Sequence, residues 1–431
     1  MNQNSLTIQT DSRVLFIDMN SFFASCEQQT NYWLRGRPVG VCVYTGKFGC
    51  IIAPSIEAKK RGIKTGMRLN DAIVMCPELV PLEINSARYR DFHVKIIKVL
   101  KKYSDDVIPK SIDEAIVNLK NYKLIHKDVT EVAKKIKQDI KNEVGDWLTC
   151  SIGIAPNAFL AKLASDMQKP DGLTIITPEN IDSILNKLRL KDLPGIAKNM
   201  AERLQRAGIN NPLELKNTSP ERLRIICKGI TGEYWHNRLN FGEVDMINQP
   251  NYKSMQAMRH LSLVQRREPG AMEEILLSLC LRLEKRMVEA NVFCKTIGIF
   301  IRYDGSDYFD KKGGYSDTIN MSIPMQDGAE ILNTLKKRIK QVEEMNTCER
   351  IINEEAISLS LYVGNFVNEE LVQYGMFEDN SKKDKLRKTV YSLKDKFGTT
   401  KLIRGAELNE ESDVRDVIGF GSIKDLNSKA Y

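Results

Sequence analysis

The feature that most constrains the fold of this chain is a short apolar run that ends in a carboxylate. Residues 14–17 read Val-Leu-Phe-Ile without interruption, and Asp18 follows them directly. A strand with one face in water alternates apolar and polar residues, whereas an unbroken run indicates a strand buried on both faces. The sequence therefore predicts a strand that is covered on both faces and closed by Asp18.

A second acidic segment reads SIDEA, residues 111–115, and lies between two apolar stretches. The flanking segments DVIPKS and EAIVNL predict a β-hairpin with SIDE at its turn. Asp113 and Glu114 are neighbours there, so their charges repel, and burial of either needs a compensating positive charge. One interpretation is a solvated turn, where Asp and Glu are common. The other interpretation is a metal site.

The metal interpretation needs the hairpin to lie beside the strand that Asp18 closes. Three carboxylates would then meet at one edge of the sheet, because adjacent side chains can converge at a turn. Three acids without a histidine favour a hard cation such as Mg²⁺, and two such ions about 4 Å apart suit phosphoryl transfer. Lys59 and Lys169 are candidates for contacts with the phosphates, although each is also typical of a solvated surface.

Patterns along the chain divide it into consecutive parts. Residues 11 to about 177 mix strands and helices as in a mixed α/β sheet domain. Residues 178–245 predict short helices with Gly and Pro breaks, and the polar residues 246–252 predict a linker. Residues 253–366 read strand, helix, strand, strand, helix, strand, which is a ferredoxin-like order. A charged tail follows, in which residues 385–398 predict a helix.

Composition narrows the class of protein. The 431 residues suggest two to four domains, and the net charge of +8 permits a polyanionic partner. No apolar run approaches the roughly 18 residues of a membrane span, and no signal peptide is visible. Nine cysteines without a C-x-x-C pair indicate a reduced, cytoplasmic protein without a membrane partner. The four histidines lie in no nucleophile motif, which argues against a hydrolase triad.

Five segments then match a known family in order and spacing. They read FIDMNSFFASCE, GCIIAPSIEAKKRGIKTG, SIDEA, SIGIAPNAFLAKLASDMQKPDGL and LPGIAKNMAERLQRAGI. Together they resemble the Y-family translesion DNA polymerases over about residues 13–366. Within that family the chain is most similar to the UmuC branch, the catalytic subunit of DNA polymerase V, and to relatives carried by mobile elements and phages of Gram-positive bacteria.

The resemblance implies an α+β multidomain fold shaped as a right hand. Its expected parts are a ferredoxin-like palm, small fingers and thumb domains, and a little finger with ferredoxin-like order. The corresponding ranges are 11–21 and 86–177 for the palm, 22–85 for the fingers, 178–245 for the thumb with its helix-hairpin-helix, 246–252 for the linker, 253–366 for the little finger and 367–431 for the tail.

The resemblance also implies the catalytic centre. Asp18, Asp113 and Glu114 match the catalytic metal-binding triad, with the backbone carbonyl of Met19 as a further ligand, and the implied cofactor is a pair of Mg²⁺ ions. The alternatives named above for the acidic pair are then decided in favour of the metal site.

Nucleotide contacts are implied in the same way. Phe23 matches the steric gate that blocks a ribose 2′-OH, with Phe22 beneath it, although an aromatic residue at a helix start is also typical of a core. Lys169 matches a lysine that contacts the triphosphate. The sequence departs from most of the family at Ile56 and Lys59, which replace a Tyr and an Arg. Ile56 cannot bind phosphate by hydrogen bonds, and Lys59 keeps the charge without the guanidinium fork. The UmuC branch shows the same kind of change.

LPGIAKNMAERLQRAGI resembles a helix-hairpin-helix, which binds DNA phosphates through N–H groups at a helix N-terminus. Gly195, Ala197 and Lys198 are its expected DNA contacts, and Ala197 stands where a second glycine is usual. A backbone with negative φ at Ala197 would tolerate that change. An ordinary Pro-Gly turn before a helix is the alternative.

Two further surfaces are implied. Basic residues of the little finger should contact DNA phosphates, or else form a solvated basic face. These residues are Arg259, Arg266 and Arg267. The peptide QYGMF, residues 373–377, resembles the motif by which bacterial polymerases bind the sliding clamp. Gln373 would supply hydrogen bonds, and Met376 and Phe377 would fill an apolar pocket.

The leading hypothesis is therefore a template-directed, error-prone DNA polymerase for translesion synthesis in DNA repair and the SOS response. It would transfer a nucleotide from a dNTP to a primer 3′-OH by two-metal catalysis in a bacterial cytoplasm, encoded by the chromosome, a plasmid or a phage. The implied partners are damaged and primed DNA, dNTPs, the sliding clamp, a UmuD-like subunit and a recombinase filament. A non-catalytic DNA- and sliding-clamp-binding accessory factor is the alternative, but it would not need the acidic cluster. A two-metal nuclease or nucleotide cyclase would not need the helix-hairpin-helix or the little finger.

Overall fold

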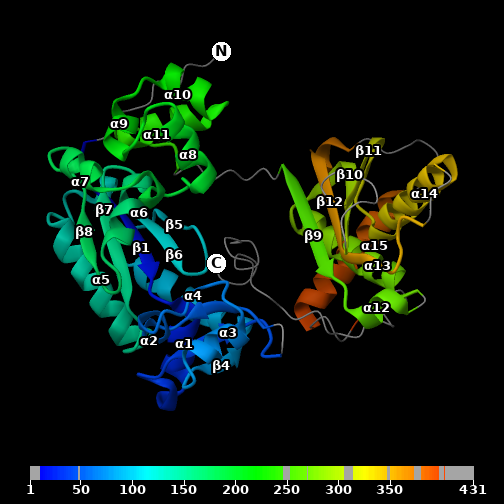
Figure 1. Ribbon diagram of the computed structural model, residues 1–431, viewed down its shortest axis with the longest axis horizontal. Helices are drawn as coiled ribbons and strands as arrows, with labels where there is room; N and C mark the ends of the chain where they lie inside the picture. Colours follow the sequence, from blue (N-terminus) through cyan, green and yellow to red (C-terminus); the bar gives the residue numbers. More distant parts are fainter. Residues whose placement is uncertain are drawn as a thin grey trace. The chain divides into compact units, whose positions relative to one another are not determined.

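The computed structural model describes residues 10–46, 49–245, 253–268, 270–304, 314–346, 350–372, 380–397 and 402. The elements from β1 (Val14–Met19) to α11 (Thr231–Leu239) form one compact unit, and those from β9 (Ser254–His260) to α15 (Asn380–Phe397) form a second (Figure 1). The predicted linker and the predicted clamp-binding peptide lie outside the described residues. Among the helices described, none is both long and apolar enough to cross a bilayer.

The first unit is built around a five-stranded sheet that contains β1, β5 (Val107–Pro109), β6 (Glu114–Asn118), β7 (Cys150–Ala155) and β8 (Leu173–Ile175). The strand order is β5-β6-β1-β7-β8. β1 is the middle strand, antiparallel to β6 on one side and to β7 on the other. All six residues of β1 are buried, which confirms the strand predicted from the apolar run.

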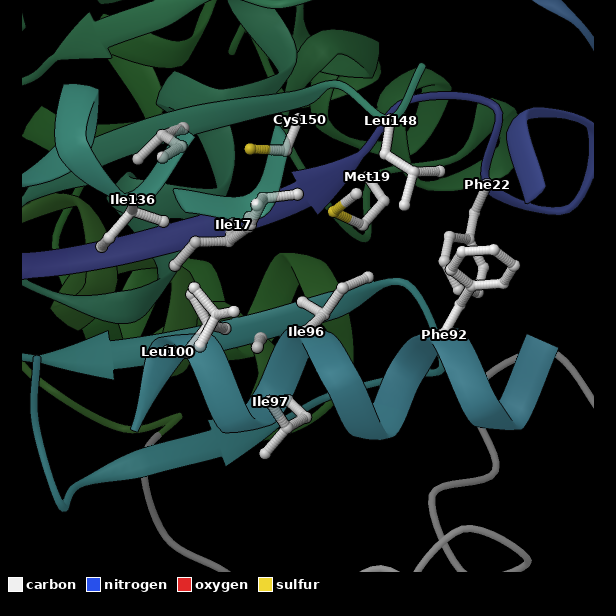
Figure 2. Packing of buried hydrophobic residues seen from close by; sticks show 14 of the residues in the cluster. Ile17, Met19, Phe22, Phe92, Ile96, Ile97, Leu100, Ile136, Leu148 and Cys150 are labelled. Carbon is white, nitrogen blue, oxygen red and sulfur yellow. The ribbon is translucent and has the colours of Figure 1, made fainter. Parts of the chain in front are cut away.

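Helices cover both faces of this sheet: α4 (Ser86–Leu100) and α5 (Val129–Glu143) on one, and α6 (Ala158–Met167) on the other. Alternate residues of β1 therefore belong to two separate cores. Ile17 lies in the core beneath α4, whereas Phe16 lies in the core beneath α6. Figure 2 shows Ile96 and Leu100 of α4 directed toward Ile17.

The connections in this sheet confirm the predicted ferredoxin-like arrangement. Apart from a smaller sheet and its helices, which are inserted between β1 and α4, the chain runs β1, α4, β5, β6, α5, β7. These strands lie in the order β5-β6-β1-β7. The predicted hairpin is present, because β5 and β6 pair antiparallel. β8 adds to the edge in parallel with β7.

A smaller sheet in the same unit has the order β3-β2-β4. Its strands are β2 (Val39–Cys42), β3 (Ile51–Pro54) and β4 (Val80–Glu83), and the neighbouring helices are α1 (Phe22–Thr30), α2 (Ile56–Lys60) and α3 (Leu69–Met75). Ser55 caps α2 by accepting a hydrogen bond from the N–H of Ala58. The sequence did not predict β4. Arg68 is the N-cap of α3.

Short helices complete the first unit, as predicted for residues 178–245. They are α7 (Ile181–Lys187), α8 (Lys198–Arg206), α9 (Pro212–Asn217), α10 (Pro220–Cys227) and α11. Asn211 and Ser219 cap α9 and α10, and a proline follows each cap, a combination that is typical of helix starts.

The second unit contains a four-stranded antiparallel sheet with the order β11-β10-β12-β9. Its elements are β9, α12 (Leu263–Arg267), α13 (Ala271–Glu289), β10 (Val292–Tyr303), β11 (Gly314–Met325), α14 (Gly328–Asn346) and β12 (Ala356–Asn368). The predicted succession of strands and long helices is confirmed, with α12 added. The strand order differs from that of the first unit, because β9 lies at the edge.

The helix predicted in the tail is α15, and it belongs to the second unit. Arg387 of α15 is only 6% exposed and donates hydrogen bonds to Asp384 at 2.7 Å, Asp327 at 3.0 Å and Gln326 at 3.1 Å. Glu284 of α13, fully buried, lies 3.9 Å from the same guanidinium. A buried charge network thus attaches the tail helix to the sheet domain.

Candidate active site

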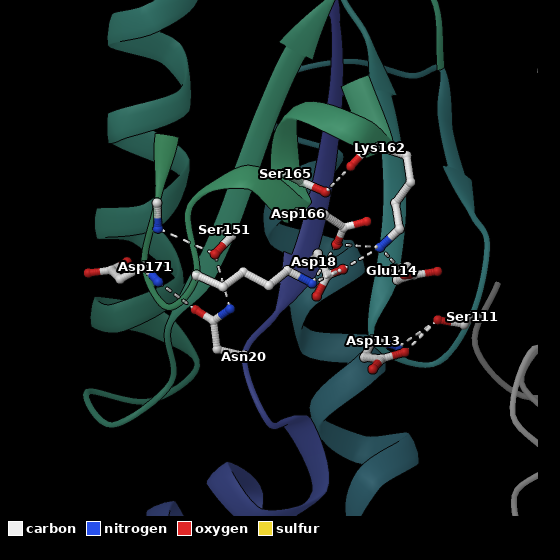
Figure 3. A network of polar contacts seen from close by, with 12 residues as sticks. Asp18, Asn20, Ser111, Asp113, Glu114, Ser151, Lys162, Ser165, Asp166 and Asp171 are labelled. Atoms are coloured by element: carbon white, nitrogen blue, oxygen red, sulfur yellow. Dashed lines mark hydrogen bonds and ion pairs between the residues drawn. The ribbon is translucent and has the colours of Figure 1, made fainter. Parts of the chain in front are cut away.

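The register of two strands places Asp18 and Glu114 opposite each other. β1 and β6 pair antiparallel, and Asp18 is the partner of Glu114. The N–H of Met19 donates to the carbonyl of Asp113 at 2.9 Å, so the turn before β6 is held against the same strand end. The predicted carboxylates of Asp18, Asp113 and Glu114 therefore come from one end of two neighbouring strands (Figure 3).

Two lysines form ion pairs with two of these carboxylates. Lys162 of α6 donates to Asp18 and to Glu114, each at 2.6 Å, and lies between them in Figure 3. Lys169 donates to the same oxygen of Asp18 at 2.7 Å. Asp113 instead accepts a hydrogen bond from the hydroxyl of Ser111. Among the described residues, the positive charge of the site is thus paired with Asp18 and Glu114, and no cation forms an ion pair with Asp113.

The pKa directions follow from these contacts. Burial would raise the pKa of Asp18, but the ammonium groups of Lys162 and Lys169 outweigh it and lower the pKa. Burial raises the pKa of Asp113, and the charge of Asp18 adds to that effect. Burial also raises the pKa of Glu114, although Lys162 opposes it. The three carboxylates are therefore unequal, and Asp18 holds its negative charge most firmly.

No group of three or more acidic, histidine or cysteine side chains in the described part of the chain is arranged to hold a metal ion as it stands. The reason is visible in the contacts, because Lys162 bridges two of the carboxylates and the third turns to Ser111. The donor set nevertheless fits Mg²⁺, since it consists of oxygens alone. Two carboxylates that already hold an ammonium at 2.6 Å form a place that stabilises a cation.

The carboxylates lie in the wall of a cavity of about 550 Å³. Further lining residues come from strand β3 of the smaller sheet and from the neighbouring helix α2. The predicted site residues that line the cavity are Asp18, Met19, Phe22, Phe23, Lys59, Asp113, Glu114 and Lys169, together with Ile56. Segments separated by up to about 150 residues thus form one cavity, which brings the predicted metal and nucleotide contacts together.

Two lysines, Lys59 and Lys169, also line the cavity, and Lys169 contacts the acidic group through Asp18. Burial and the nearby charge of Lys169 lower the pKa of Lys59. Burial would also lower the pKa of Lys169, but the Asp18 carboxylate raises it overall. Two ammonium groups that repel each other stabilise an anion bound between them. Ile56 lines the same cavity, and its side chain has no hydrogen-bonding group.

Aromatic side chains form another part of the wall. Phe23 is 3% exposed and stacks on Tyr89 of α4, with ring centroids 4.4 Å apart and an interplanar angle of 11°. Phe22 lies next to it, with a centroid distance of 6.0 Å and a tilt of 47°. Phe23 thus combines a core position with an edge on the cavity.

Comparisons with known proteins concern the same segments. The model of the impB/mucB/samB family matches residues 17–166, and the model of that family's C-terminal domain matches residues 252–376. DNA polymerase IV 1 of Bacillus subtilis (strain 168) is 31% identical over 413 residues, which span 93% of this chain and 94% of the relative. DNA polymerase IV of Listeria monocytogenes serotype 4b (strain CLIP80459) is 29% identical over 327 residues, which span 75% of this chain and 90% of the relative.

A solved structure agrees in fold. The Y-family DNA polymerase chimera Dbh-Dpo4(243-245)-Dbh has a TM-score of 0.67 with 23% identity, and the match covers 82% of this chain and 99% of that one. The chain belongs to the Y-family DNA polymerases of the impB/mucB/samB family. The family and the right-hand α+β fold predicted from the sequence are thereby confirmed. The placement in the UmuC branch stays a prediction, because the relatives named here are DNA polymerases IV.

The predicted helix-hairpin-helix of this Y-family polymerase lies at the start of α8. Gly195 has φ +84, a conformation that glycine adopts without strain. Ala197 is the N-cap with φ −86, so an alanine fits there, and no side chain caps the first N–H groups. Lys198, the first residue of α8, is exposed. The DNA-binding role of these residues stays a prediction.

The predicted DNA contacts of the second unit are spread over two elements. Arg259 lies near the end of β9 and is partly buried. Arg266 of α12 donates to the carbonyl of Leu261 at 3.3 Å and lies 3.7 Å from Asp304, whereas Arg267 is exposed. Of the three, Arg267 is presented most freely to a ligand.

Sequence reasoning missed Lys162 and Asn20. Lys162 is a charged residue within the apolar helix segment AFLAKLASDM, and that contrast was the available signal. Asn20 accepts a hydrogen bond from the N–H of Asp171 at 2.8 Å and donates to Ser151 at 3.1 Å. It thereby holds the loop that carries Lys169 against the end of β1. The direct succession of Asp18, Met19 and Asn20 after a buried strand pointed to this position.

Proposed function

We propose that this Y-family member is a template-directed, error-prone DNA polymerase that performs translesion synthesis. The observation that carries the proposal is the arrangement of one cavity. Carboxylates from two strand ends line one wall, the ammonium groups of Lys59 and Lys169 line the same cavity, and Phe23 forms a flat apolar surface nearby. A nucleoside triphosphate needs contacts of these three kinds, for its reacting phosphate, its outer phosphates and its sugar.

The proposal also assigns parts of the chain to the domains of a right-hand polymerase. The five-stranded sheet would be the palm at 11–21 and 86–177, and the smaller sheet would be the fingers at 22–85. The helices at 178–245 would be the thumb, and the sheet domain at 253–366 the little finger. The tail at 367–431 would carry the clamp-binding peptide.

Asp18, Asp113 and Glu114, with the carbonyl of Met19, would hold two Mg²⁺ ions. When bound, such ions lower the pKa of an attacking hydroxyl and neutralise charge on the phosphates. Lys162 would release its carboxylates for that purpose, and Lys59 and Lys169 would hold the outer phosphates. In the overall reaction the primer 3′-OH attacks the α-phosphate of the dNTP, and pyrophosphate leaves.

Phe23 would exclude ribonucleotides, because its ring fills the space that a 2′-OH requires. The small fingers would close loosely over a damaged template base, so selection against a wrong pair would be weak. Gly195, Ala197, Lys198, Arg259, Arg266 and Arg267 would bind DNA phosphates, which gives affinity without sequence preference.

The finer biological assignment is also part of the proposal. Membership of the UmuC branch would bring the chain into the SOS response, with a UmuD-like subunit, a recombinase filament and the sliding clamp as partners. Ile56 and Lys59 support that branch, since they replace the Tyr and Arg of most family members. The bacterial cytoplasm would be the site of action.

Primer extension tests the proposal. The full chain and an Asp113→Asn, Glu114→Gln variant are incubated with Mg²⁺, dNTPs and a primed template, either undamaged or with one abasic site. We expect extension by the wild type and a roughly thousandfold lower rate in the variant, because several kcal/mol of charge stabilisation are lost. A Glu354→Gln, Glu355→Gln variant is the matched control, since it removes an adjacent acidic pair that is exposed in the second unit.

Extension by the acidic-site variant at the wild-type rate would contradict the assignment of the catalytic carboxylates. Extension of undamaged DNA with a complete stop at the abasic site would contradict translesion synthesis. DNA binding without extension, also in the presence of a clamp and a recombinase filament, would identify the chain as an accessory factor.

A further inference from the structure

A buried tyrosine lies directly behind the ring that borders the sugar side of the cavity. Tyr89 of α4 is fully buried, and its ring lies nearly parallel to that of Phe23, with centroids 4.4 Å apart. Phe23 therefore has the cavity on one side and a flat aromatic support on another. Stacked aromatic pairs hold each other's position more closely than aliphatic contacts do.

The other end of the tyrosine is also fixed. Its hydroxyl donates a hydrogen bond of 2.9 Å to Glu27, which is 6% exposed. Arg88 donates to the second carboxylate oxygen of Glu27. Burial and the nearby Glu27 carboxylate raise the pKa of Tyr89, so the hydroxyl keeps its proton and remains a donor. The carboxylate is thus paired on both oxygens.

Both contacts of Tyr89 return to the same helix. Phe23 and Glu27 are four residues apart on α1, so they lie one above the other on one side of that helix. Tyr89 comes from α4, which packs on the sheet that carries the carboxylates. A rotation of Phe23 about its own bonds, or a shift of α1 against α4, would break the stack or the hydrogen bond.

We propose that Tyr89 is a positioning residue for sugar selection: it holds the Phe23 ring at the cavity, while Glu27 and Arg88 hold Tyr89. This inference rests on the proposed polymerase function and deepens it, because it makes the exclusion of ribonucleotides depend on a buried residue outside the cavity. A ring that blocks a 2′-OH must keep its place, and Phe23 alone has freedom about two side-chain bonds. The support behind it removes that freedom.

Sugar selectivity is the measurement that separates positioning from general stability. The ratio of kcat/KM for dCTP to that for rCTP, opposite a template guanine, is determined for the full chain and its variants. Phe23→Ala serves as the benchmark for complete loss of the gate. Tyr89→Leu removes the stack and the hydrogen bond, and Tyr89→Phe removes the hydrogen bond alone.

Tyr103 supplies the matched controls. It is also a buried tyrosine beside α4, 6% exposed, and its hydroxyl donates to Asp139 at 2.6 Å. The Tyr103→Leu and Tyr103→Phe variants remove the same atoms from the same core cluster, away from Phe23. Thermal melting shows whether the Tyr89 variants and the corresponding Tyr103 variants lose similar amounts of stability.

We expect Phe23→Ala to lower the dCTP/rCTP ratio most, Tyr89→Leu to lower it about tenfold and Tyr89→Phe about two- to threefold. The Tyr103 variants should keep the wild-type ratio even where they melt at a lower temperature. The inference is overturned if Phe23→Ala lowers the ratio while both Tyr89 variants keep it.

The failures of the two proposals remain distinguishable. A wild-type chain that incorporates no dCTP contradicts the polymerase function itself. A wild-type chain that incorporates dCTP, with Phe23→Ala unchanged in its ratio, contradicts the gate and with it the role of Tyr89. Should Tyr89→Leu not fold, Tyr89→Phe decides alone: a dCTP/rCTP ratio lowered about two- to threefold supports the inference, and an unchanged ratio overturns it.

Discussion

The two larger sheets of this molecule have the same succession of elements and different strand orders. In the first unit the opening strand β1 lies in the middle, between β6 and β7. In the second unit the opening strand β9 lies at the edge, next to β12. The succession strand, helix, strand, strand, helix, strand therefore does not determine where the first strand goes.

The composition of the first strand does distinguish the two sheets. β1 is apolar from Val14 to Ile17 and is buried at every residue, because each face meets a different core. In β9 the residues alternate, so Met255 is 1% exposed while Met258 is 51% exposed. A middle strand such as β1 has protein on both sides and both faces, so it can end in a cavity lined by protein. The edge strand β9 leaves one of its faces exposed to solvent.

The largest effect should come from truncating these strands. Leu15→Ala and Phe16→Ala should each lower the free energy of unfolding by about 4 kcal/mol, because neighbours in β1 fill two different cores. Met255→Ala should lower it by about 3 kcal/mol, and Met258→Ala by less than about 0.5 kcal/mol. Chemical denaturation of the full chain measures these values.

A similar loss in the free energy of unfolding for Met255→Ala and Met258→Ala would contradict the difference between β1 and β9, since it would mean that both faces of β9 are covered in solution. Leu15 and Phe16 provide the internal control, because they must behave alike for β1 to count as a middle strand.

A somewhat smaller effect should come from the buried cations. Lys162→Met leaves Asp18 and Glu114 without their shared partner, and Arg387→Met leaves Glu284 and Asp327 without theirs. Each change should lower stability by about 3 kcal/mol in metal-free buffer, because buried carboxylates lose a cationic partner. Thermal melting with and without millimolar Mg²⁺ separates the two sites.

Mg²⁺ should restore much of the stability lost in Lys162→Met, since the ion can take the place of the ammonium between the carboxylates. It should restore none in Arg387→Met, whose network lies among α13, α14 and α15. Equal recovery of both variants would show a general salt effect and would remove the distinction between an exchangeable and a permanent buried cation.

The smallest effect concerns pH. Burial raises the pKa of Asp113, so its ionised form weakens the fold once the pH exceeds the ordinary range of an aspartate. Burial would also raise the pKa of Asp327, but N–H groups of α14 and Arg387 lower it, so ionised Asp327 strengthens the fold. Asp113→Asn should therefore raise metal-free stability at pH 7 by about 1 kcal/mol, and Asp327→Asn should lower it.

Melting temperatures between pH 3 and pH 8 check the signs. The gain from Asp113→Asn should vanish as the pH falls below the ordinary aspartate pKa, because the wild-type carboxyl is then protonated in both states. The loss from Asp327→Asn should vanish as the pH falls through the lowered pKa of the folded state. Stability changes of the same sign for Asp113→Asn and Asp327→Asn at pH 7 would contradict the opposite pKa shifts assigned to these two residues.

Much of this architecture could be predicted from local pattern. The apolar run at 14–17 and the SIDE turn located β1 and the β5–β6 hairpin, and their pairing brought the three carboxylates together. β4 was missed because Val-Pro-Leu-Glu contains a proline, which is typical of an edge strand and weakens a strand prediction. Its partner β2 lies about forty residues earlier in the chain, so no local turn signals the pairing.

The site was predicted less completely than the fold. Acidic residues next to apolar runs can be recognised in the sequence, because a charge that is buried needs a compensating partner. Lys162 reaches Asp18 across 144 residues, and Tyr89 reaches Glu27 across 62, so both contacts depend on how helices pack on the sheet. A side chain whose role comes from such packing looks ordinary in the sequence.

The pairing of Asp18 with Glu114 has a consequence for the folding of the chain. A slip of β1 by one residue against β6 would turn every side chain to the opposite face, and Leu15 and Ile17 would exchange cores with Phe16. Such a chain would lose both cores at the moment it lost its carboxylate alignment. Correct folding and the alignment of the carboxylates therefore depend on the same strand register: a polypeptide that reaches the native state carries Asp18 opposite Glu114.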